Sequence, residues 1–250
     1  QALAEDYIRM GVAKMRKMEE PVPEPQDIDR TILVVGGGFA GMHAALNAAD
    51  AGSKVILLEK EDSLGGYMKK LYKHYPMDAP YTELKENNTD ALIEKVNSNP
   101  DITVYTGASI KKISGAPGMF DGTFDVGGQE VTHKLGAIIM ATGSKPYDAN
   151  NLGHLGYGKS ADVITNAEME ELAAKGSLTR PSDGKPVESV VFVQCAGSRD
   201  PEHLPYCSGH CCMTTLKQAR YVRELNPEAR VYIVYKDIRT PGHYEDFYRQ

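Results

Sequence analysis

Residues 31–60, TILVVGGGFAGMHAALNAADAGSKVILLEK, contain the pattern that decides the fold. An apolar run ends in a glycine-rich turn, an alanine-rich segment continues to Gly52, and a second apolar run ends at Glu59. Strand, helix and strand in this order form a βαβ unit, whose two strands lie parallel. We therefore predict an α/β fold built on a parallel sheet.

Three glycines of this stretch, Gly36, Gly38 and Gly41, have the G-x-G-x-x-G spacing of a dinucleotide-binding turn. The first allows a tight turn, the second lets a pyrophosphate approach the backbone, and the third lets the helix pack on the strand. The N-terminus of the helix adds N–H donors and the positive end of its dipole. Glu59 closes the second strand, where an acid accepts hydrogen bonds from a ribose diol. The sequence thus predicts a bound dinucleotide.

Composition excludes several classes of function. The 250 residues carry a net charge of −6, with 41% hydrophobic and 25% charged residues. This balance offers no basic field for nucleic acid or anionic lipid. Neither a membrane-spanning apolar run nor a signal peptide is evident, so we expect a cytoplasmic protein without direct membrane insertion. Because the sequence starts at Gln and ends without a clear stop, we expect it to be a fragment.

Beyond the first unit, the chain shows further helical and strand patterns. Residues 5–19 and 81–100 have helical spacing, residues 101–143 predict strands and a meander, and residues 161–176 predict a helix capped by Thr165 or Asn166. Strand, helix and strand recur at 189–198, 210–225 and 229–240, which predicts a second βαβ unit. We predict four parts: an N-terminal helix and Pro-rich linker (1–29), a first lobe (30–150), a connecting segment (151–186) and a second, incomplete lobe (187–250).

All four cysteines, Cys195, Cys207, Cys211 and Cys212, lie within CAGSRDPEHLPYCSGHCC, residues 195–212. This stretch is the first strand-to-helix crossing of the second unit, where no second glycine fingerprint is present. Four thiols can hold zinc, hold an iron–sulfur cluster, or serve as redox thiols. An adjacent Cys–Cys pair suits tetrahedral zinc poorly, whereas each thiolate of a cluster binds its own iron, which favours a 4Fe–4S cluster.

Neighbouring histidines are weaker candidates for iron ligands or proton carriers. His203 and His210 lie in the same loop, and we expect both to face solvent.

The segments EKEDSLGG (59–66) and GAIIMATG (136–143) resemble the FAD-binding lobe of two-dinucleotide-domain flavoproteins, the glutathione reductase and thioredoxin reductase class. This resemblance implies a Rossmann-like, two-lobe FAD/NAD(P)-binding fold with FAD in the first lobe. In that class, the LGG segment lies near the flavin and the ATG turn closes over the cofactor. The predicted cofactor-binding residues are Gly36, Gly38, Phe39, Ala40, Gly41, Glu59, Lys60, Gly65, Gly66, Ile110, Ala141, Thr142 and Gly143.

A later segment resembles the heterodisulfide reductase A-subunit family, and it follows the FAD-binding motifs in the chain. This segment is FVQCAGSRDPEHLPYCSGHCCMTTLKQA, residues 192–219. Within this family, GAPGMFDGTFDV, ATGSKPYDA and RPSDGKPVESVVFVQCAGSRD resemble the B-subunit branch from the quinone-interacting membrane-bound oxidoreductase complexes of sulfate reducers. The resemblance implies that the four cysteines ligate the cluster and that the oxidoreductase relays electrons between FAD and the cluster, as one part of a complex. The implied partners are a quinone-reactive subunit and a sulfur-metabolism reductase, which would associate the protein with a membrane.

Two other functions stay open on sequence grounds. One is an NAD(P)H-dependent disulfide reductase with Cys211 and Cys212 as its dithiol. The other is a flavin-binding docking scaffold held together by a zinc knot.

Overall fold

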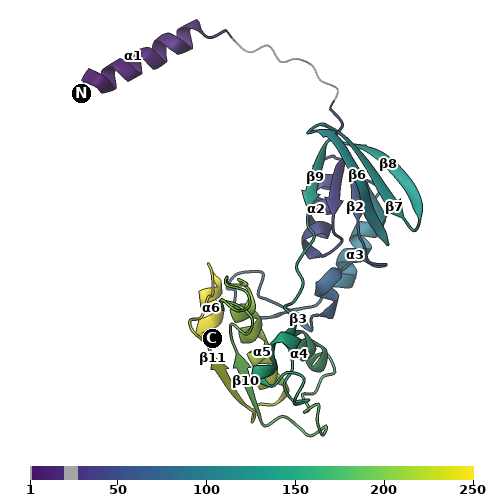
Figure 1. The fold of residues 1–250 in the computed structure, drawn as a ribbon, viewed down its shortest axis with the longest axis vertical. Coiled ribbons are helices and arrows are strands. Elements are labelled where there is room, and N and C mark those ends of the chain that lie inside the picture. The colour runs from purple at the N-terminus through teal and green to yellow at the C-terminus, as the bar shows by residue number, and fades with distance from the viewer. Residues whose placement is uncertain (1, 20–27) are drawn as a thin grey trace.

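The computed structural model describes residues 2–19 and 28–250, which form two lobes and a separate N-terminal helix (Figure 1). Helix α1 (Ala2–Lys17) agrees with the predicted helix and buries none of its residues. The predicted Pro-rich linker falls largely on residues 20–27, which lie outside the described residues. None of the helices that the structure describes is long and apolar enough to cross a membrane.

The first lobe is built on a four-stranded parallel sheet in the order β5-β2-β1-β9. Its strands are β1 (Ile32–Val35), β2 (Val55–Leu58), β5 (Ile102–Tyr105) and β9 (Ala137–Met140). Helix α2 (Phe39–Asp50) joins β1 to β2, which confirms the predicted βαβ unit. Because all four strands are parallel, their carboxyl ends lie at the same edge of the sheet, where ligands of open α/β sheets bind.

A layer of secondary structure covers each face of this sheet. Helices α2 and α3 (Thr89–Ser98) pack on one face around Val34, Met42 and Leu57. The antiparallel meander covers the other face, around Leu33, Phe124 and Leu135. Its strands are β6 (Ala108–Ala116), β7 (Met119–Val126) and β8 (Gln129–Leu135). The sheet is therefore a buried middle layer, as its nearly continuous apolar strands predict.

Helix α3 is shorter than the predicted helix over residues 81–100. It begins at Thr89 because the Asn87 side chain accepts hydrogen bonds from the backbone N–H (3.1 Å) and hydroxyl (2.7 Å) of Thr89. The residues before it form β4 (Lys85–Glu86), which pairs with β3 (Lys73–His74). Local hydrogen bonding by Asn87 thus moves the start of α3 about two turns later in the sequence than the helical spacing predicts.

The second lobe repeats the strand–helix–strand order on a smaller scale. Strands β10 (Ser189–Val193) and β11 (Arg230–Val234) are parallel and are joined by helix α5 (Cys211–Leu225), which confirms the second βαβ unit. Helix α4 (Asn166–Ala173) packs beside α5 around buried Met169, Ala173, Tyr221 and Val222. The short helices η2 (Ala149–Leu155) and α6 (Tyr244–Arg249) complete this part of the chain.

The start of α4 shows why the sequence signal there was reliable. Thr165, one of the two predicted caps, accepts from the Glu168 backbone N–H (3.2 Å), and the Glu168 carboxylate accepts from the Thr165 N–H (2.6 Å). This reciprocal capping box satisfies two backbone donors that the helix itself cannot.

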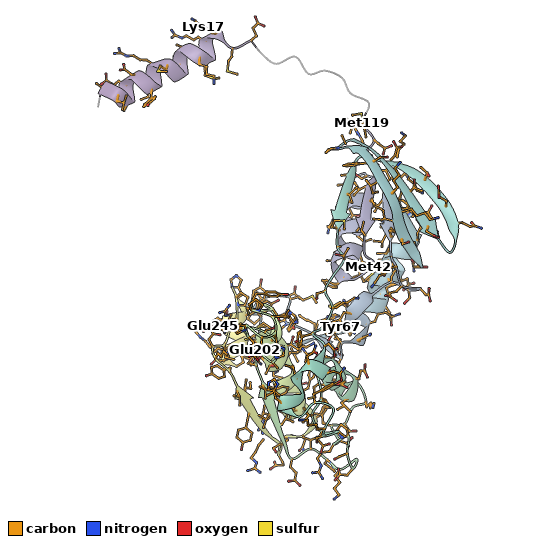
Figure 2. All side chains as sticks on the ribbon, viewed as in Figure 1. Lys17, Met42, Tyr67, Met119, Glu202 and Glu245 are labelled. Atoms are coloured by element: carbon orange, nitrogen blue, oxygen red, sulfur yellow. The ribbon has the colours of Figure 1, made fainter. Side chains whose placement is uncertain are left out.

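A bridging segment, defined here as residues 66–88, connects the two lobes. It contains η1 (Gly66–Lys70), β3 and β4, and Figure 2 shows Tyr67 at the place where the lobes meet. This segment follows β2 of the first lobe and packs against α4 and α5 of the second. It therefore sets the position of α5 relative to the glycine turn.

The bridging segment is held against α4 and α5 by hydrogen bonds to a buried ion pair that joins these two helices. Lys217 Nζ lies 3.1 Å from Glu170 Oε1, and both side chains are about 1% exposed. Lys217 also donates to the Lys73 carbonyl (2.9 Å), and the Tyr72 backbone N–H donates to Glu170 Oε2 (2.9 Å). Tyr221 and Gln218 donate to the same carboxylate, at 3.1 and 2.7 Å. Burial lowers the pKa of Lys217, while Glu170 acts in the opposite direction.

We expect Lys217→Met to lower the free energy of unfolding by about 3–5 kcal/mol, because it leaves the Glu170 carboxylate buried without its cation. The double variant Lys217→Met/Glu170→Leu should lose less than the sum of the two single variants. Urea unfolding measures both effects. As a control, Lys134→Met breaks the exposed pair with Asp121 (2.6 Å) and should change stability by no more than about 1 kcal/mol. Equal losses in the two single-lysine variants would contradict this assignment.

Candidate functional site

The glycine turn between β1 and α2 combines close packing with open space. An added Cβ at Gly41 would lie 1.7 Å from the Gly36 carbonyl oxygen, and one at Gly36 would lie 2.2 Å from the Ala141 carbonyl oxygen. Gly36 also has φ +107°, which favours glycine. An added Cβ at Gly38, in contrast, would meet no protein atom within 4 Å. The middle glycine therefore faces open space, as expected where a pyrophosphate approaches the backbone.

The start of α2 offers hydrogen-bond donors to that space. Gly38 is its N-cap, and no side chain caps the helix. The first-turn N–H groups, with the positive end of the helix dipole, fit a phosphate. Predicted contact residue Phe39 starts the helix with its ring against His43 (centroids 4.4 Å apart), and Ala40 is exposed beside it.

Glu59 lies beneath the glycine turn. Its carboxylate accepts hydrogen bonds from the Gly37 N–H (2.6 Å) and the Glu61 N–H (2.8 Å), and the residue is 6% exposed. A carboxylate has about four lone-pair sites, so two remain for other donors such as a ribose diol. Lys60 points elsewhere, because its ammonium is exposed and pairs with Glu61 (3.3 Å).

The structure brings the two other glycine-containing segments to the same turn. Gly65 donates to the Gly37 carbonyl (2.8 Å), and an added Cβ at Gly66 would lie 3.2 Å from the Gly38 Cα. At the end of β9, Ala141 lies against Gly36 and Gly41, with Thr142 and Gly143 exposed beyond it. The donor groups, the open space and these neighbours fit an FAD.

Ile110 is not brought to the turn by any contact of the described residues. It lies on β6, 38% exposed and paired with Phe124 of β7. Its role in cofactor binding stays a prediction.

The cysteine loop connects β10 to α5 through residues 194–210. Cys195 and Arg199 have positive φ (58° and 54°), which non-glycine residues adopt rarely. Gly197 and Gly209 also have positive φ, so four residues of the loop adopt left-handed backbone conformations. Cys195 therefore follows the carboxyl end of β10, whereas Cys211 and Cys212 form the first turn of α5.

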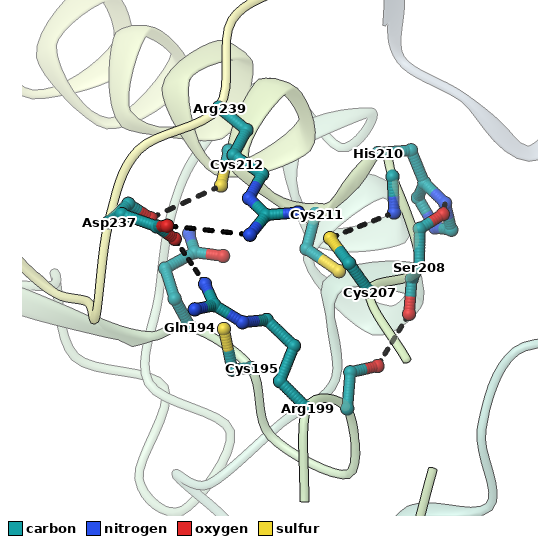
Figure 3. Close-up of a pocket in the computed structure, with 12 residues that line it drawn as sticks. Gln194, Cys195, Arg199, Cys207, Ser208, His210, Cys211, Cys212, Asp237 and Arg239 are labelled. Atoms are coloured by element: carbon teal, nitrogen blue, oxygen red, sulfur yellow. Dashed lines mark hydrogen bonds and ion pairs between the residues drawn. The ribbon is translucent and has the colours of Figure 1, made fainter. Parts of the chain in front are cut away.

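All four thiols line one small pocket (Figure 3). They are unpaired and partly buried, and the guanidinium groups of Arg199 and Arg239 lie between them in Figure 3. Both arginines pair with Asp237. The remaining cavity is about 10 Å³, which corresponds to roughly one water. Across residues 2–19 and 28–250, no three His, Cys, Asp or Glu side chains converge closely enough for a single metal ion.

Two of the thiols make hydrogen bonds with backbone groups. Gly209 N–H donates to Cys207 Sγ (3.4 Å), and Cys212 Sγ donates to the Asp237 carbonyl (3.9 Å). Burial raises the pKa of the Cys211 thiol, and Cys207 and Cys212 add to this increase. The N-terminus of α5, with no side-chain cap, favours thiolates at its first turn.

One buried donor of this pocket has no partner. Gln194, 8% exposed, lines the pocket beside Cys195, and its Nε2 makes no hydrogen bond to any residue that the structure describes. The cysteine sulfurs at the strand end, in the loop and at the helix start can bind iron, while the N–H donor to Cys207 Sγ and the unpaired amide of Gln194 suit the negative charge on the sulfurs of such a group. The residues thus fit an iron–sulfur cluster, whose thiolates bind separate irons.

The sequence prediction that His203 faces solvent is wrong. Its Nδ1 lies 2.7 Å from the Tyr147 hydroxyl, and the ring is half-buried. Tyr147 follows the ATG turn by four residues, and an added Cβ at Gly197 would lie 2.5 Å from its ring. The cysteine loop is therefore packed directly onto the segment that follows β9 and the ATG turn. His210 is exposed, as predicted.

Comparison with known proteins now defines the class. The profile of the family described as "Pyridine nucleotide-disulphide oxidoreductase" matches residues 30–193, and the chain belongs to this family. Membership makes it an oxidoreductase and implies FAD as its cofactor, as the sequence predicted. The match ends with the last residue of β10, immediately before the cysteine loop.

The similar curated proteins have more specific names. A protein of Methanopyrus kandleri, named as an iron-sulfur A-subunit of CoB--CoM heterodisulfide reductase, is 32% identical in an alignment 332 positions long, which covers 99% of this chain and 50% of that protein. The protein of the same name in Methanocaldococcus jannaschii is also 32% identical, with the same shares covered. The chain thus spans about half the length of these relatives.

A solved structure confirms the predicted two-lobe fold class. Thioredoxin reductase from Lactococcus lactis aligns with a TM-score of 0.50 and 15% identity, covering 88% of this chain and 60% of that one. At this identity the likeness concerns the fold alone.

We expect Gly38→Ala to keep the fold and lose FAD, because its Cβ enters the space where the pyrophosphate would lie rather than touching protein atoms. Gly41→Ala should instead destabilise the apoprotein, since its Cβ collides with backbone. Flavin absorbance per chain and the thermal midpoint of the apoprotein separate the two effects. Retention of full flavin content by Gly38→Ala would count against this placement of the cofactor.

We expect Tyr147→Ala to loosen the cysteine loop, because it removes the ring packed on Gly197 and the hydrogen bond to His203. Tyr147→Phe, the matched control, keeps the ring and should lose only about 0.5–1.5 kcal/mol. Hydrogen exchange of residues 196–210 measures the change. The same exchange rates in the Ala variant and the wild type would show that the packing does not hold the loop.

Proposed function

We propose that this chain is the electron-transfer part of a heterodisulfide reductase-like complex, with FAD at the glycine turn and a 4Fe–4S cluster at the cysteine loop. One observation carries the proposal: both turns follow the first strand of a βαβ unit, one lined by glycines and N–H donors, the other by all four cysteines of the chain. We divide the chain into residues 1–29, 30–150, 151–186 and 187–250.

When bound, FAD exchanges two electrons and a 4Fe–4S cluster exchanges them one at a time. The protein's task is to place the two groups and to tune them. The Glu59 carboxylate would hold the ribose, and the N-terminus of α2 would hold the pyrophosphate. Gly65, Gly66 and Ala141 shape the wall beside the turn. The remaining predicted contacts, Lys60, Ile110, Thr142 and Gly143 among them, belong to the proposal as well.

The cysteine loop would supply one thiolate from the strand end, one from the loop and two from the start of α5. Arg199 and Arg239 would have to move outward to admit a cluster, because their guanidinium groups now lie between the sulfur atoms. Near the rim of the pocket, these cations would still offset part of the negative charge of the thiolates.

The finer assignment follows the sequence resemblance. We propose that the chain acts like the B subunit of quinone-interacting complexes in sulfur metabolism, in the cytoplasm and at a membrane through its partners. Those partners are a quinone-reactive subunit and a sulfur-metabolism reductase. The names of the relatives, which call them subunits of heterodisulfide reductases, support a multi-subunit setting.

A second candidate is supported by the family match, whose description names pyridine nucleotides and disulphides. In this candidate, NAD(P)H would reduce FAD, and FAD would reduce a disulfide between Cys211 and Cys212. One observation favours the first candidate: the second lobe has no G-x-G-x-x-G turn to bind a nicotinamide dinucleotide. Anaerobic titration with NADH and NADPH tests the second candidate directly.

We expect the full-length protein, purified without oxygen, to contain flavin and about four irons at the cysteine loop. Cys207→Ser should lose this iron and its EPR signal after reduction, while flavin content stays unchanged because the glycine turn is intact. His210→Asn is the matched control: it alters the neighbouring exposed loop position and should keep the iron. Zinc in place of iron would instead indicate a structural knot. Iron that survives in Cys207→Ser would contradict the proposed ligand set.

A further inference from the structure

Gln194 is held in a fixed position at the end of β10. Its backbone N–H donates to the Val234 carbonyl (2.8 Å), which extends the pairing of β10 with β11 by one residue. The next residue, Cys195, turns sharply with φ 58°. The side chain of Gln194 is 8% exposed, so the strand directs it into the protein rather than toward solvent.

The amide of Gln194 is a donor without an acceptor. Three buried side-chain polar atoms lack a partner among the described residues: His74 Nδ1, Gln218 Oε1 and Gln194 Nε2. Of these, Gln194 Nε2 belongs to a residue that lines the thiol pocket. A buried donor that stays unpaired destabilises the folded protein, so such an atom calls for a partner that is bound in the working protein.

The neighbouring polar side chains of the pocket, unlike Gln194, already have partners. Arg199 and Arg239 both pair with the carboxylate of Asp237, so their charges are already partly compensated. Ser198 is also buried in the pocket, but its hydroxyl is 2.5 Å from that of Ser208. Gln194 is therefore a neutral residue of the pocket lining whose amide nitrogen has no partner among the described residues.

We propose that Gln194 Nε2 donates a hydrogen bond to a sulfur of the cluster held by the four cysteines, and that this bond raises the reduction potential of the cluster. The inference rests on the proposed function. Its physical reason is that reduction adds negative charge to the sulfurs, so a donor to sulfur stabilises the reduced state more than the oxidised one. Gln194 is thus a positioning and tuning residue rather than a ligand.

The test is an EPR-monitored redox titration of the full-length protein and of Gln194→Leu, which keeps the volume and removes the donor. We expect unchanged iron content and a midpoint displaced to more negative potential. At the wild-type midpoint, the ratio of oxidised to reduced cluster should rise about tenfold, which equals about 59 mV for a one-electron couple. Gln194→Glu, which replaces the donor with a carboxylate, should shift the midpoint further in the same direction. Ser198→Ala, whose hydroxyl is already paired, is the control and should shift it much less.

The outcomes separate this inference from the proposed function. Wild-type protein that binds no iron would overturn both, whereas a Gln194→Leu variant with full iron and an unchanged midpoint would overturn the inference alone. A second measurement requires no variant: protein labelled with ¹⁵N in glutamine side chains should show ¹⁵N hyperfine coupling to the reduced cluster. Gln218, the other buried glutamine, donates to Glu170 and the Asn166 carbonyl instead. Absence of the ¹⁵N coupling in iron-loaded protein would also refute the inference.

Discussion

The arrangement of the site depends on the buried contact between Lys217 and Glu170. This ion pair joins helix α5, which begins with two cysteines, to α4 and to the backbone of the bridging segment. The bridging segment in turn starts at Gly66, which lies against Gly38 of the glycine turn. A charged pair at this depth needs near-complete hydrogen bonding to be tolerated, and the partners Tyr72, Tyr221 and Gln218 supply it. This polar cluster therefore contributes to the relative position of the two turns, beside the apolar packing of Tyr72 and Leu84 on the core of the second lobe.

A second connection between the two turns runs along the chain itself. The segment that leaves β9 reaches Tyr147 within a few residues, and this ring packs on Gly197 of the cysteine loop. The glycine turn and the thiol pocket are thus linked in two places. One link runs through the bridging segment and α5, and the other runs through Tyr147 and His203. Each lobe contributes the carboxyl end of a first strand, which is where open α/β sheets place ligands. The same local architecture therefore serves two chemically different groups.

The sequence predicted those parts of the fold that local patterns determine. The two βαβ units, over residues 32–58 and 189–234, and the Thr165 cap follow from apolar runs, glycines and a capping box that lie close in sequence. The same patterns mispredicted the start of α3, because the Asn87 side chain overrides helical spacing there.

The sequence also grouped the four cysteines correctly around one pocket. It held no signal for Asp237 or Arg239, which reach that pocket from beyond β11. His203 was misjudged for a similar reason, since its partner Tyr147 is 56 residues away. Gln194 is adjacent to Cys195, yet only burial and an unpaired amide distinguish it from an ordinary strand residue.

The thiol pocket is assembled almost entirely by neighbours in sequence. Its four sulfurs come from eighteen consecutive residues, enclosed by a strand end and a helix start. Contacts of such short separation form early, because little chain entropy is lost in closing the loop. During synthesis, all four cysteines and α5 would leave the ribosome before β11 does, because they precede it in the chain. The four thiols can therefore be brought together on the nascent chain first, with Asp237 and Arg239 completing the wall of the pocket afterwards.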